Sequence, residues 1–163
     1  MGTKITDYSP KIFEVFNKGW ALLTAGTKDK FNSMTVSWGG LGTLWGKPVA
    51  TVYVRPSRYT HEFIDKNSIF TLSFYPEEQK PALRVMGAIS GRDKDKVKES
   101  GLTPIVLENG AVTYNETEMT IVCKKLYKQP MGPSQIPEEA KVFYKDGDYH
   151  DIYIAEVIEI VGK

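Results

Sequence analysis

Residues 22–60 read LLTAGTKDKFNSMTVSWGGLGTLWGKPVATVYVRPSRYT, and this stretch decides the fold class. Segments rich in valine, threonine, leucine and tyrosine alternate in it with short polar or glycine-rich segments, a pattern typical of strands joined by turns. Residues 28–30 are short enough to close a hairpin between the first two segments. By the same criteria, strands are predicted over residues 20–27, 31–38, 49–55, 68–74, 119–127 and 152–161.

Helices are fewer than strands. Short helices are predicted at residues 10–19, at residues 57–67 and, interrupted by prolines and glycines, at residues 76–101. The glycine-rich residues 38–48 and the proline-rich residues 129–137 are predicted to be loops. Because the helices do not alternate with the strands, the sequence predicts a mainly β fold with α excursions, in the form of a closed or partly closed antiparallel barrel.

Length and composition predict one globular domain, residues 1–163, and exclude several classes of protein. Hydrophobic residues make up 41% and charged residues 25% of the chain, which excludes an intrinsically disordered protein. The formal net charge of +1 is too small for the positive field that non-specific binding to nucleic acid or to an anionic membrane requires. No apolar run approaches the ~20 residues of a membrane span. We therefore expect no nucleic-acid partner and no membrane association.

The cysteine content indicates the compartment. Cys123 is the single cysteine, so the chain can form neither an internal disulfide nor a site with several thiolate ligands. The first thirty residues also lack the features of a secretory signal peptide. The sequence therefore predicts a cytoplasmic protein.

Residues 52–60, VYVRPSRYT, predict an anion site. Arg55 and Arg58 can donate paired hydrogen bonds, Ser57 and Thr60 offer hydroxyl donors, and the first turn of the predicted helix favours negative charge. This set of donors suits a phosphate group. The alternative is that Ser57 or Thr60 only caps the helix while both arginines lie in solvent.

Two further segments place backbone groups within reach of a ligand. Residues 32–40, NSMTVSWGG, combine small side chains with glycines that let the backbone approach a ligand closely. They are not a dinucleotide-binding fingerprint, because no helix follows the glycines. Residues 90–96, SGRDKDK, place basic groups near a helix start. The alternatives are a wide turn for the glycines and a solvated helix end for the charged residues.

The two histidines each stand beside a carboxylate in the sequence, as His61-Glu62 and His150-Asp151. Neighbouring side chains on a strand point to opposite faces, so neither pair forms a catalytic dyad by itself. Two separate histidines and one cysteine are also a weak basis for a zinc site. No metal site is predicted, no catalytic residue is identified, and Cys123 is expected to be a core thiol.

Residues 22–60, the segment SGRDKDK (90–96) and the segment HDIYIAEV (150–157), in this order, resemble the flavin reductase-like family of FMN-binding split-barrel proteins. The most specific part of the likeness is NSMTVSWGG together with VRPSRYT at the family's spacing, and the likeness covers nearly the whole chain. The resemblance implies a six-stranded antiparallel split β-barrel, a homodimer, and FMN bound near the subunit interface. The last strand, apolar on both faces, is consistent with a subunit contact.

The resemblance also implies roles for particular residues. The strand ending at Trp38 would line the isoalloxazine with its backbone, residues 55–60 would hold the ribityl phosphate, and residues 90–96 would close over the flavin. His150 and Tyr153 would reach the site from the last strands. The implied cofactor-binding residues are Met34, Thr35, Val36, Ser37, Trp38, Arg55, Ser57, Arg58, Tyr59, Thr60, Ser90, Gly91, Arg92 and Lys96.

Three functions are compatible with these features. The first is an oxidoreductase of the flavin reductase type that transfers hydride from NAD(P)H to flavin. The second is a flavoredoxin-like FMN electron-transfer protein without NAD(P)H activity of its own, which exchanges electrons with a redox protein partner. The third is a barrel of the same kind with a different small ligand. The resemblance includes family members of the first two kinds, so it does not choose between them.

Overall fold

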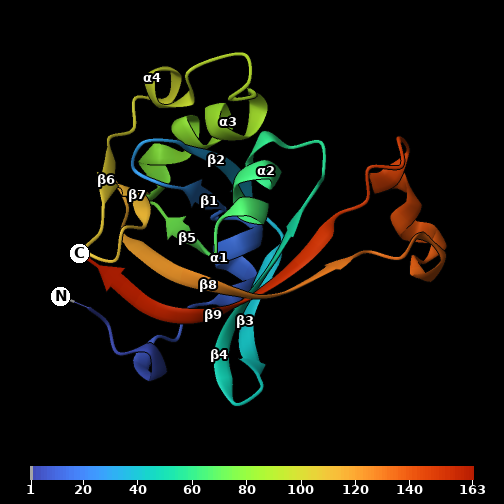
Figure 1. Cartoon of the computed structure of the whole chain (residues 1–163), viewed down its shortest axis with the longest axis horizontal. Helices are drawn as coiled ribbons and strands as arrows, with labels where there is room; N and C mark the ends of the chain where they lie inside the picture. The colour runs from blue at the N-terminus through green and yellow to red at the C-terminus, as the bar shows by residue number, and fades with distance from the viewer. Residues whose placement is uncertain (1) are drawn as a thin grey trace.

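The computed structural model describes residues 2–163, and its centre is a seven-stranded antiparallel sheet in the order β2-β1-β5-β8-β9-β4-β3 (Figure 1). Each of the six predicted strands is present, and this confirms the mainly β fold. The strands of this sheet are β1 (Ala21–Gly26), β2 (Phe31–Val36), β3 (Gly39–Leu44), β4 (Lys47–Val54), β5 (Ile69–Phe74), β8 (Met119–Pro130) and β9 (Asp151–Gly162).

The prediction of a loop at residues 38–48 is wrong, and so is the implied count of six strands. Part of that segment forms β3, which pairs with β4 in an antiparallel hairpin. The turn of the hairpin is Trp45-Gly46, with φ angles of 52° and 70°. Two successive positive φ angles match the twist of a tight hairpin. The glycines did not prevent strand pairing, because the ladder uses backbone hydrogen bonds and requires no side chain.

The sheet is not a closed barrel, because its edge strands β2 and β3 do not pair with each other. The two edges are nevertheless joined directly by Ser37-Trp38. Val36 of β2 and Val52 of β4 belong to one core cluster, against which Leu41 of β3 also packs. The sheet therefore surrounds a single core while one side stays open.

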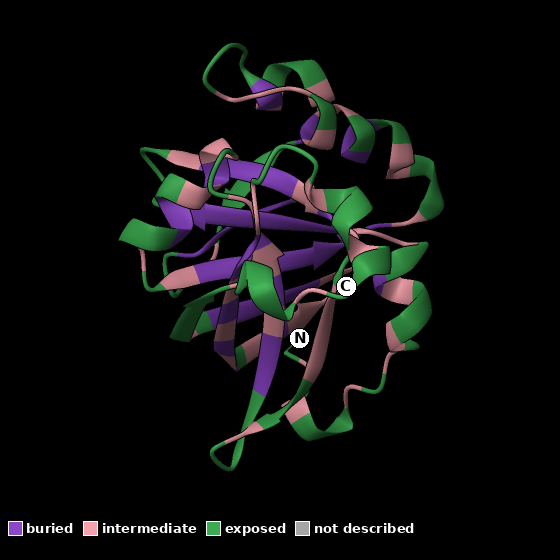
Figure 2. Cartoon of the chain, turned by 90° about the vertical axis from the view of Figure 1, so that its right-hand side faces the viewer, coloured by how far each residue is buried: buried purple, intermediate pink, exposed green. Residues whose placement is uncertain are grey.

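Helices are present in all three predicted regions. Two of them contribute Phe16, Phe63 and Ile64 to the core that the sheet surrounds, and most of the buried residues lie in the strands (Figure 2). No helix within residues 2–163 is long and apolar enough to cross a membrane. The α-helices are α1 (Ile12–Asn17), α2 (Tyr59–Lys66), α3 (Lys80–Ala88) and α4 (Lys96–Ser100), and the 3₁₀ helices are η1 (Ile5–Asp7), η2 (Glu77–Gln79), η3 (Pro133–Gln135) and η4 (Glu138–Tyr144).

Two features were not predicted. A small two-stranded sheet pairs β6 (Pro104–Val106) with β7 (Val112–Tyr114), and strands of three residues are too short to give a clear pattern. The segment between β8 and β9 carries η3 and η4 and projects away from the sheet (Figure 1). The predicted loop at residues 129–137 is part of this segment, except that β8 extends to Pro130.

The register of the sheet brings three predicted residues together. β3 and β9 both pair with β4, and the start of each lies opposite the end of β4. Trp38, Arg55 and His150 each lie one residue outside one of these strands. All three are consequently at the same end of the sheet.

Candidate functional site

A pocket of about 190 Å³ lies where these strand ends meet. It contains seven of the predicted cofactor residues, which come from the end of β2, the connection to β3, and the segment between β4 and α2. The volume is below the ~300 Å³ at which complete small-molecule sites begin. The lining residues are Met34, Thr35, Val36, Ser37, Trp38, Tyr53, Arg55, Arg58 and His150.

Arg58 is one of two arginines that give the pocket positive charge. Its guanidinium donates one hydrogen bond, to the backbone oxygen of Gly87 at 3.2 Å, and forms no ion pair within residues 2–163. Partial burial, with a smaller contribution from the neighbouring Arg55, lowers the pKa of Arg58. A half-buried cation without a counter-ion favours binding of an anion.

Arg55 holds the segment that precedes β9. Its Nη1 donates to the backbone oxygen of Asp148 at 2.8 Å and its Nη2 to that of Phe143 at 2.7 Å. The guanidinium also lies 4.9 Å from the centre of the Tyr144 ring. Arg55 lines the pocket but forms no ion pair in the described chain, so its charge also remains available to an anion.

Ser57 lies next to the pocket, and its donors already have an acceptor. The Ser57 hydroxyl hydrogen-bonds to Oδ2 of Asp148, and the Ser57 backbone N–H donates to Oδ1 of the same carboxylate at 3.3 Å. The N-cap residue of α2 is Arg58, not Ser57 or Thr60, and its side chain makes no cap hydrogen bond.

Tyr59 and Thr60 point away from the pocket. The Thr60 hydroxyl is buried and accepts a hydrogen bond from Nδ2 of Asn32 at 2.8 Å. The ring of Tyr59 packs edge-on against Phe63, with the Arg92 guanidinium 4.8 Å from its centre. Both residues connect α2 to neighbouring elements, and the structure does not bring them together with Arg58 in one cavity.

The segment 90–96 also lies outside the pocket, and its first residues pack against α2. Arg92 donates to the backbone oxygen of Ser57 at 3.1 Å and to the Glu62 carboxylate at 2.6 Å, while its backbone N–H donates to the Ser90 hydroxyl. A Cβ at Gly91 would lie only 2.2 Å from Oδ1 of Asn32, so this close approach requires glycine. Arg92 therefore has a carboxylate partner, unlike the two arginines of the pocket.

Lys96 is a buried lysine that has no carboxylate partner among residues 2–163. Its Nζ donates to the backbone oxygens of Ser33 at 2.6 Å and Met86 at 2.7 Å, which ties α4 to β2 and α3. Burial, with the Arg58 charge as a smaller cause, lowers the pKa of Lys96 to about 8. Together with Tyr59 and Gly91, Lys96 lines a second pocket of about 430 Å³ beside the first half of β2.

His150 lines the first pocket and is buried there. Its Nδ1 is 2.6 Å from the Tyr144 hydroxyl, and its ring lies edge-on to Trp38, with 5.6 Å between the ring centres. Burial, reinforced by the Arg55 charge, lowers the pKa of His150 to about 4. The imidazole is consequently neutral at pH 7, where it leaves the positive charge of the pocket to the arginines.

The lowered pKa of His150 predicts a specific loss of stability in acid. An unfolded histidine titrates near 6.5, so between about pH 6.5 and 4 the unfolded chain binds more protons than the folded one. The contribution of His150 to stability is thus present above about pH 6.5 and is lost as the pH falls towards 4. We expect His150→Phe to lose less unfolding free energy across this window than the unchanged protein, as measured by urea unfolding. Parallel pH profiles of the two proteins would contradict the expectation.

The sequence did not reveal a polar network on the other side of β9. His61 Nε2 lies 2.6 Å from Oδ2 of Asp151, and the Tyr153 hydroxyl donates to Asp65 at 2.6 Å and lies 3.2 Å from His61 Nε2. Lys128 adds an ion pair with Asp65 at 2.8 Å. The carboxylate partner of His61 is not its sequence neighbour Glu62 but Asp151, 90 residues away. Tyr153 is therefore part of this network and not of the pocket.

An apolar groove of about 860 Å³ adjoins the pocket, and Trp38 lines both cavities. Its other walls come from the segment that projects between β8 and β9, together with Ile152. No side chain that lines it is charged. The lining residues are Trp38, Gln129, Pro130, Met131, Gly132, Gln135, Ile136, Pro137, Ala140, Phe143, Tyr144 and Ile152.

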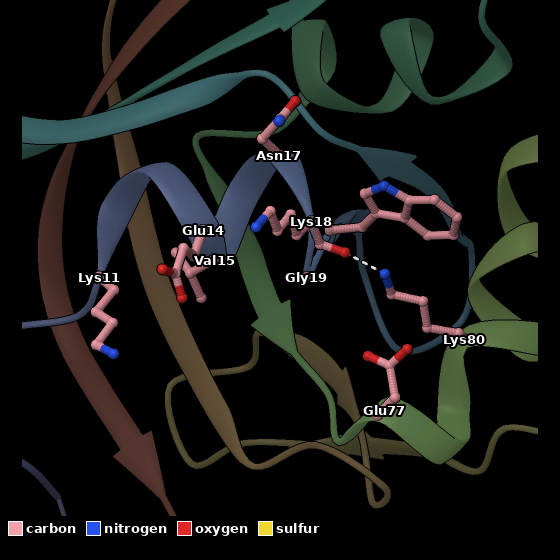
Figure 3. Close-up of a pocket in the computed structure, with 9 residues that line it drawn as sticks. Lys11, Glu14, Val15, Asn17, Lys18, Gly19, Glu77 and Lys80 are labelled. Carbon is pink, nitrogen blue, oxygen red and sulfur yellow. Dashed lines mark hydrogen bonds between the residues drawn. The ribbon is translucent and has the colours of Figure 1, made fainter.

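A further cavity of about 700 Å³ lies between the end of α1 and the start of α3 (Figure 3). Lys80 reaches across it and hydrogen-bonds to the backbone oxygen of Lys18. The Lys80 ammonium also lies 4.4 Å from the centre of the Trp20 ring. This cavity contains none of the residues predicted to bind a cofactor, and of its three lysines Lys80 is already engaged by the protein.

A family model described as flavin reductase like domain matches residues 13–163. A comparison with curated proteins finds no match. The family match includes both the pocket and the 90–96 segment.

Solved structures share the fold over nearly all of the chain. An FMN-binding protein from Thermus thermophilus with bound p-hydroxybenzaldehyde has 19% identity and a TM-score of 0.72, and covers 100% of this chain and 82% of its own. Flavoredoxin from Methanosarcina acetivorans has 20% identity and a TM-score of 0.71, with 99% and 76% covered. An NADH:FAD oxidoreductase from Streptomyces globisporus has 18% identity and a TM-score of 0.68, with 89% and 75% covered. At these identities the likeness establishes the fold alone.

Proposed function

The chain belongs to the flavin reductase-like family, and on this premise we propose that it binds FMN at the 190 Å³ pocket that Arg55 and Arg58 line, here named the Trp38 pocket, and transfers hydride from NAD(P)H to flavin. One observation carries the proposal. Arg55 and Arg58 place two guanidinium groups in one pocket, and neither has an ion-pair partner within residues 2–163. Such a pair of cations suits the phosphate of FMN.

The proposed roles follow from the position of each group. Bound FMN would supply the redox chemistry, accepting hydride from a nicotinamide nucleotide and passing electrons to an acceptor. Arg58 and Arg55 would bind the phosphate. β2 is an edge strand, so part of its backbone between Thr35 and Ser37 has no strand partner and can hydrogen-bond to the ring. Backbone N–H groups in that position would stabilise negative charge that develops on a reduced flavin.

The thiol is not required for this chemistry. Cys123 is fully buried in β8, and burial raises the pKa of its thiol far above the usual range. A neutral thiol without access to the pocket cannot act as a nucleophile. The chain thus contributes binding and electrostatics.

A flavoredoxin-like electron carrier is the second candidate, and the apolar groove favours it. A nicotinamide nucleotide carries an anionic pyrophosphate, which cations or backbone N–H groups usually bind. The groove beside the pocket offers it no charged side chain. A carrier that receives electrons from a protein partner does not need a nucleotide site.

The visible spectrum of the purified protein with FMN distinguishes the candidates. Flavin absorbance that co-purifies or is retained after gel filtration, and that NADH or NADPH bleaches under anaerobic conditions, supports the reductase. Retained flavin that neither nucleotide bleaches, but that dithionite does, supports the carrier. If the protein retains no FMN and does not change the fluorescence of added FMN, the result contradicts both candidate functions and favours a different small ligand.

We also propose a homodimer. The chain exposes several large hydrophobic side chains near the pocket and on β9, including Trp38, Phe143 and Ile158. The Trp38 pocket is too small to enclose FMN, so a second chain could complete it. We expect light scattering at micromolar concentration to give twice the 18.3 kDa mass of one chain. The mass of a single chain would contradict this proposal.

A further inference from the structure

The position predicted for the FMN phosphate is held by one of the protein's own carboxylates. Both Asp148 oxygens accept hydrogen bonds from Ser57, one from the hydroxyl and one from the backbone N–H at 3.3 Å. Ser57 lies just before α2, where the first turn of the helix favours negative charge. The Asp148 side chain therefore occupies the two Ser57 donors that a phosphate would use, while Arg55 and Arg58 form no ion pair with it.

Contacts to the backbone hold Asp148 in this position. Arg55 donates to the backbone oxygens of Phe143 and Asp148, and its guanidinium lies 4.9 Å from the centre of the Tyr144 ring. These contacts fix the end of the projecting segment against the start of α2. The carboxylate is thereby presented to Ser57 by a backbone that is itself anchored.

A carboxylate and a phosphate cannot share the Ser57 donors. A phosphate monoester carries about −1.5 to −2 charge at pH 7. Each donor has one hydrogen, and like charges within 4–6 Å disfavour each other. Riboflavin has the same ring system but no phosphate, so it does not compete with Asp148 for the Ser57 donors.

We propose that Asp148 is a specificity-determining residue that occupies the phosphate position in the flavin-free protein and weakens the binding of FMN relative to riboflavin. The inference rests on the proposed function. FMN binding requires the Asp148 carboxylate to leave Ser57, and the phosphate then accepts the Ser57 hydrogen bonds and the charge of Arg55 and Arg58. The balance between the two anions sets how strongly the protein prefers phosphorylated flavin.

The variant Asp148→Asn tests this directly, because it removes the charge and keeps the shape. Dissociation constants for FMN and riboflavin are measured by quenching of flavin fluorescence. We expect Asp148→Asn to tighten FMN binding about tenfold, equivalent to about 1.4 kcal/mol, and to change riboflavin binding less than twofold. Glu139→Gln is the control, because it removes one negative charge from the same exposed segment at a residue that does not contact Ser57. Asp148→Ser also removes the charge and must shift FMN binding in the same direction.

A second arm tests whether Asp148 acts through Ser57. In a Ser57→Ala background, Asp148→Asn should tighten FMN binding by clearly less than tenfold, because the contested hydroxyl is gone and only the backbone N–H remains. A tenfold effect that persists there would overturn the inference, since the carboxylate would then act only at a distance. Equal shifts for FMN and riboflavin, or no shift for FMN, would also overturn it while leaving FMN binding intact. Failure of every variant and of the unchanged protein to bind FMN would refute the proposed function as well.

Discussion

Replacing Arg58 by alanine is expected to weaken FMN binding by about ten- to a hundredfold. Charge-assisted hydrogen bonds contribute ~1.5–3 kcal/mol each, and 1.4 kcal/mol corresponds to a factor of ten in affinity. Arg58 is the stronger candidate of the two arginines because its guanidinium has one hydrogen bond, whereas Arg55 already anchors two backbone oxygens. Riboflavin binding should change little, because riboflavin has no phosphate.

Two measurements make this prediction specific. Isothermal titration with FMN and riboflavin gives the affinity ratio, and Arg84→Ala, an exposed arginine outside the pocket, serves as the control. Thermal unfolding of the flavin-free Arg58→Ala protein shows whether the variant is folded, since the substitution also removes the hydrogen bond to the Gly87 backbone oxygen. An equal loss of affinity for both flavins would contradict the assignment of Arg58 to the phosphate.

Replacing Ser37 by phenylalanine is expected to lower the retained flavin by at least about tenfold without unfolding the protein. Ser37 is half-buried and lines the 190 Å³ pocket between the two edge strands. A phenyl ring there would fill space that the flavin ring needs, and binding depends on that shape. The ratio of flavin to protein absorbance after gel filtration measures the effect. Retention of a full complement of FMN would contradict the placement of the ring against this connection.

Gly39, two residues further on, is the matched contrast. A Cβ at Gly39 would lie 2.8 Å from Cε1 of Phe16 and 2.9 Å from the backbone oxygen of Thr51, so it points into the core and not into the pocket. Gly39→Ala should therefore destabilise the fold by about 1–3 kcal/mol, as overpacking does. Urea unfolding measures this loss, while any Gly39→Ala protein that remains folded should bind FMN with nearly unchanged affinity.

The strands could be predicted because their pattern is local. Most of the six predicted strands carry their own run of β-branched and aromatic residues, and each is present within about three residues of its predicted ends. The exception is β3. Its glycines are typical of a loop, and only pairing with β4 through the Trp45-Gly46 turn makes it a strand. The sequence without its partner strand does not contain this information.

The candidate site, like the fold, was predictable from the sequence only where its pattern is local. Residues 52–60 carry their anion donors within one short stretch, so the sequence alone indicated positive charge at the start of a helix, and the structure places Arg55 and Arg58 in one pocket. The structure also separates Thr60 and Lys96 from that pocket, because both side chains are directed towards the first half of β2. Which side of a helix or loop a polar group faces depends on what packs against it.

The sequence by itself determined the mainly β fold, the positions of six strands and the concentration of phosphate donors between β4 and α2. Only the tertiary structure decided which acceptors those donors meet. The carboxylate on Ser57 belongs to Asp148, 91 residues later, and the partner of His61 is Asp151, 90 residues later. Contacts of this range depend on strand register and on the path of the segment between β8 and β9. A local pattern cannot encode them, because the free energy of each contact depends on elements that are distant in the chain.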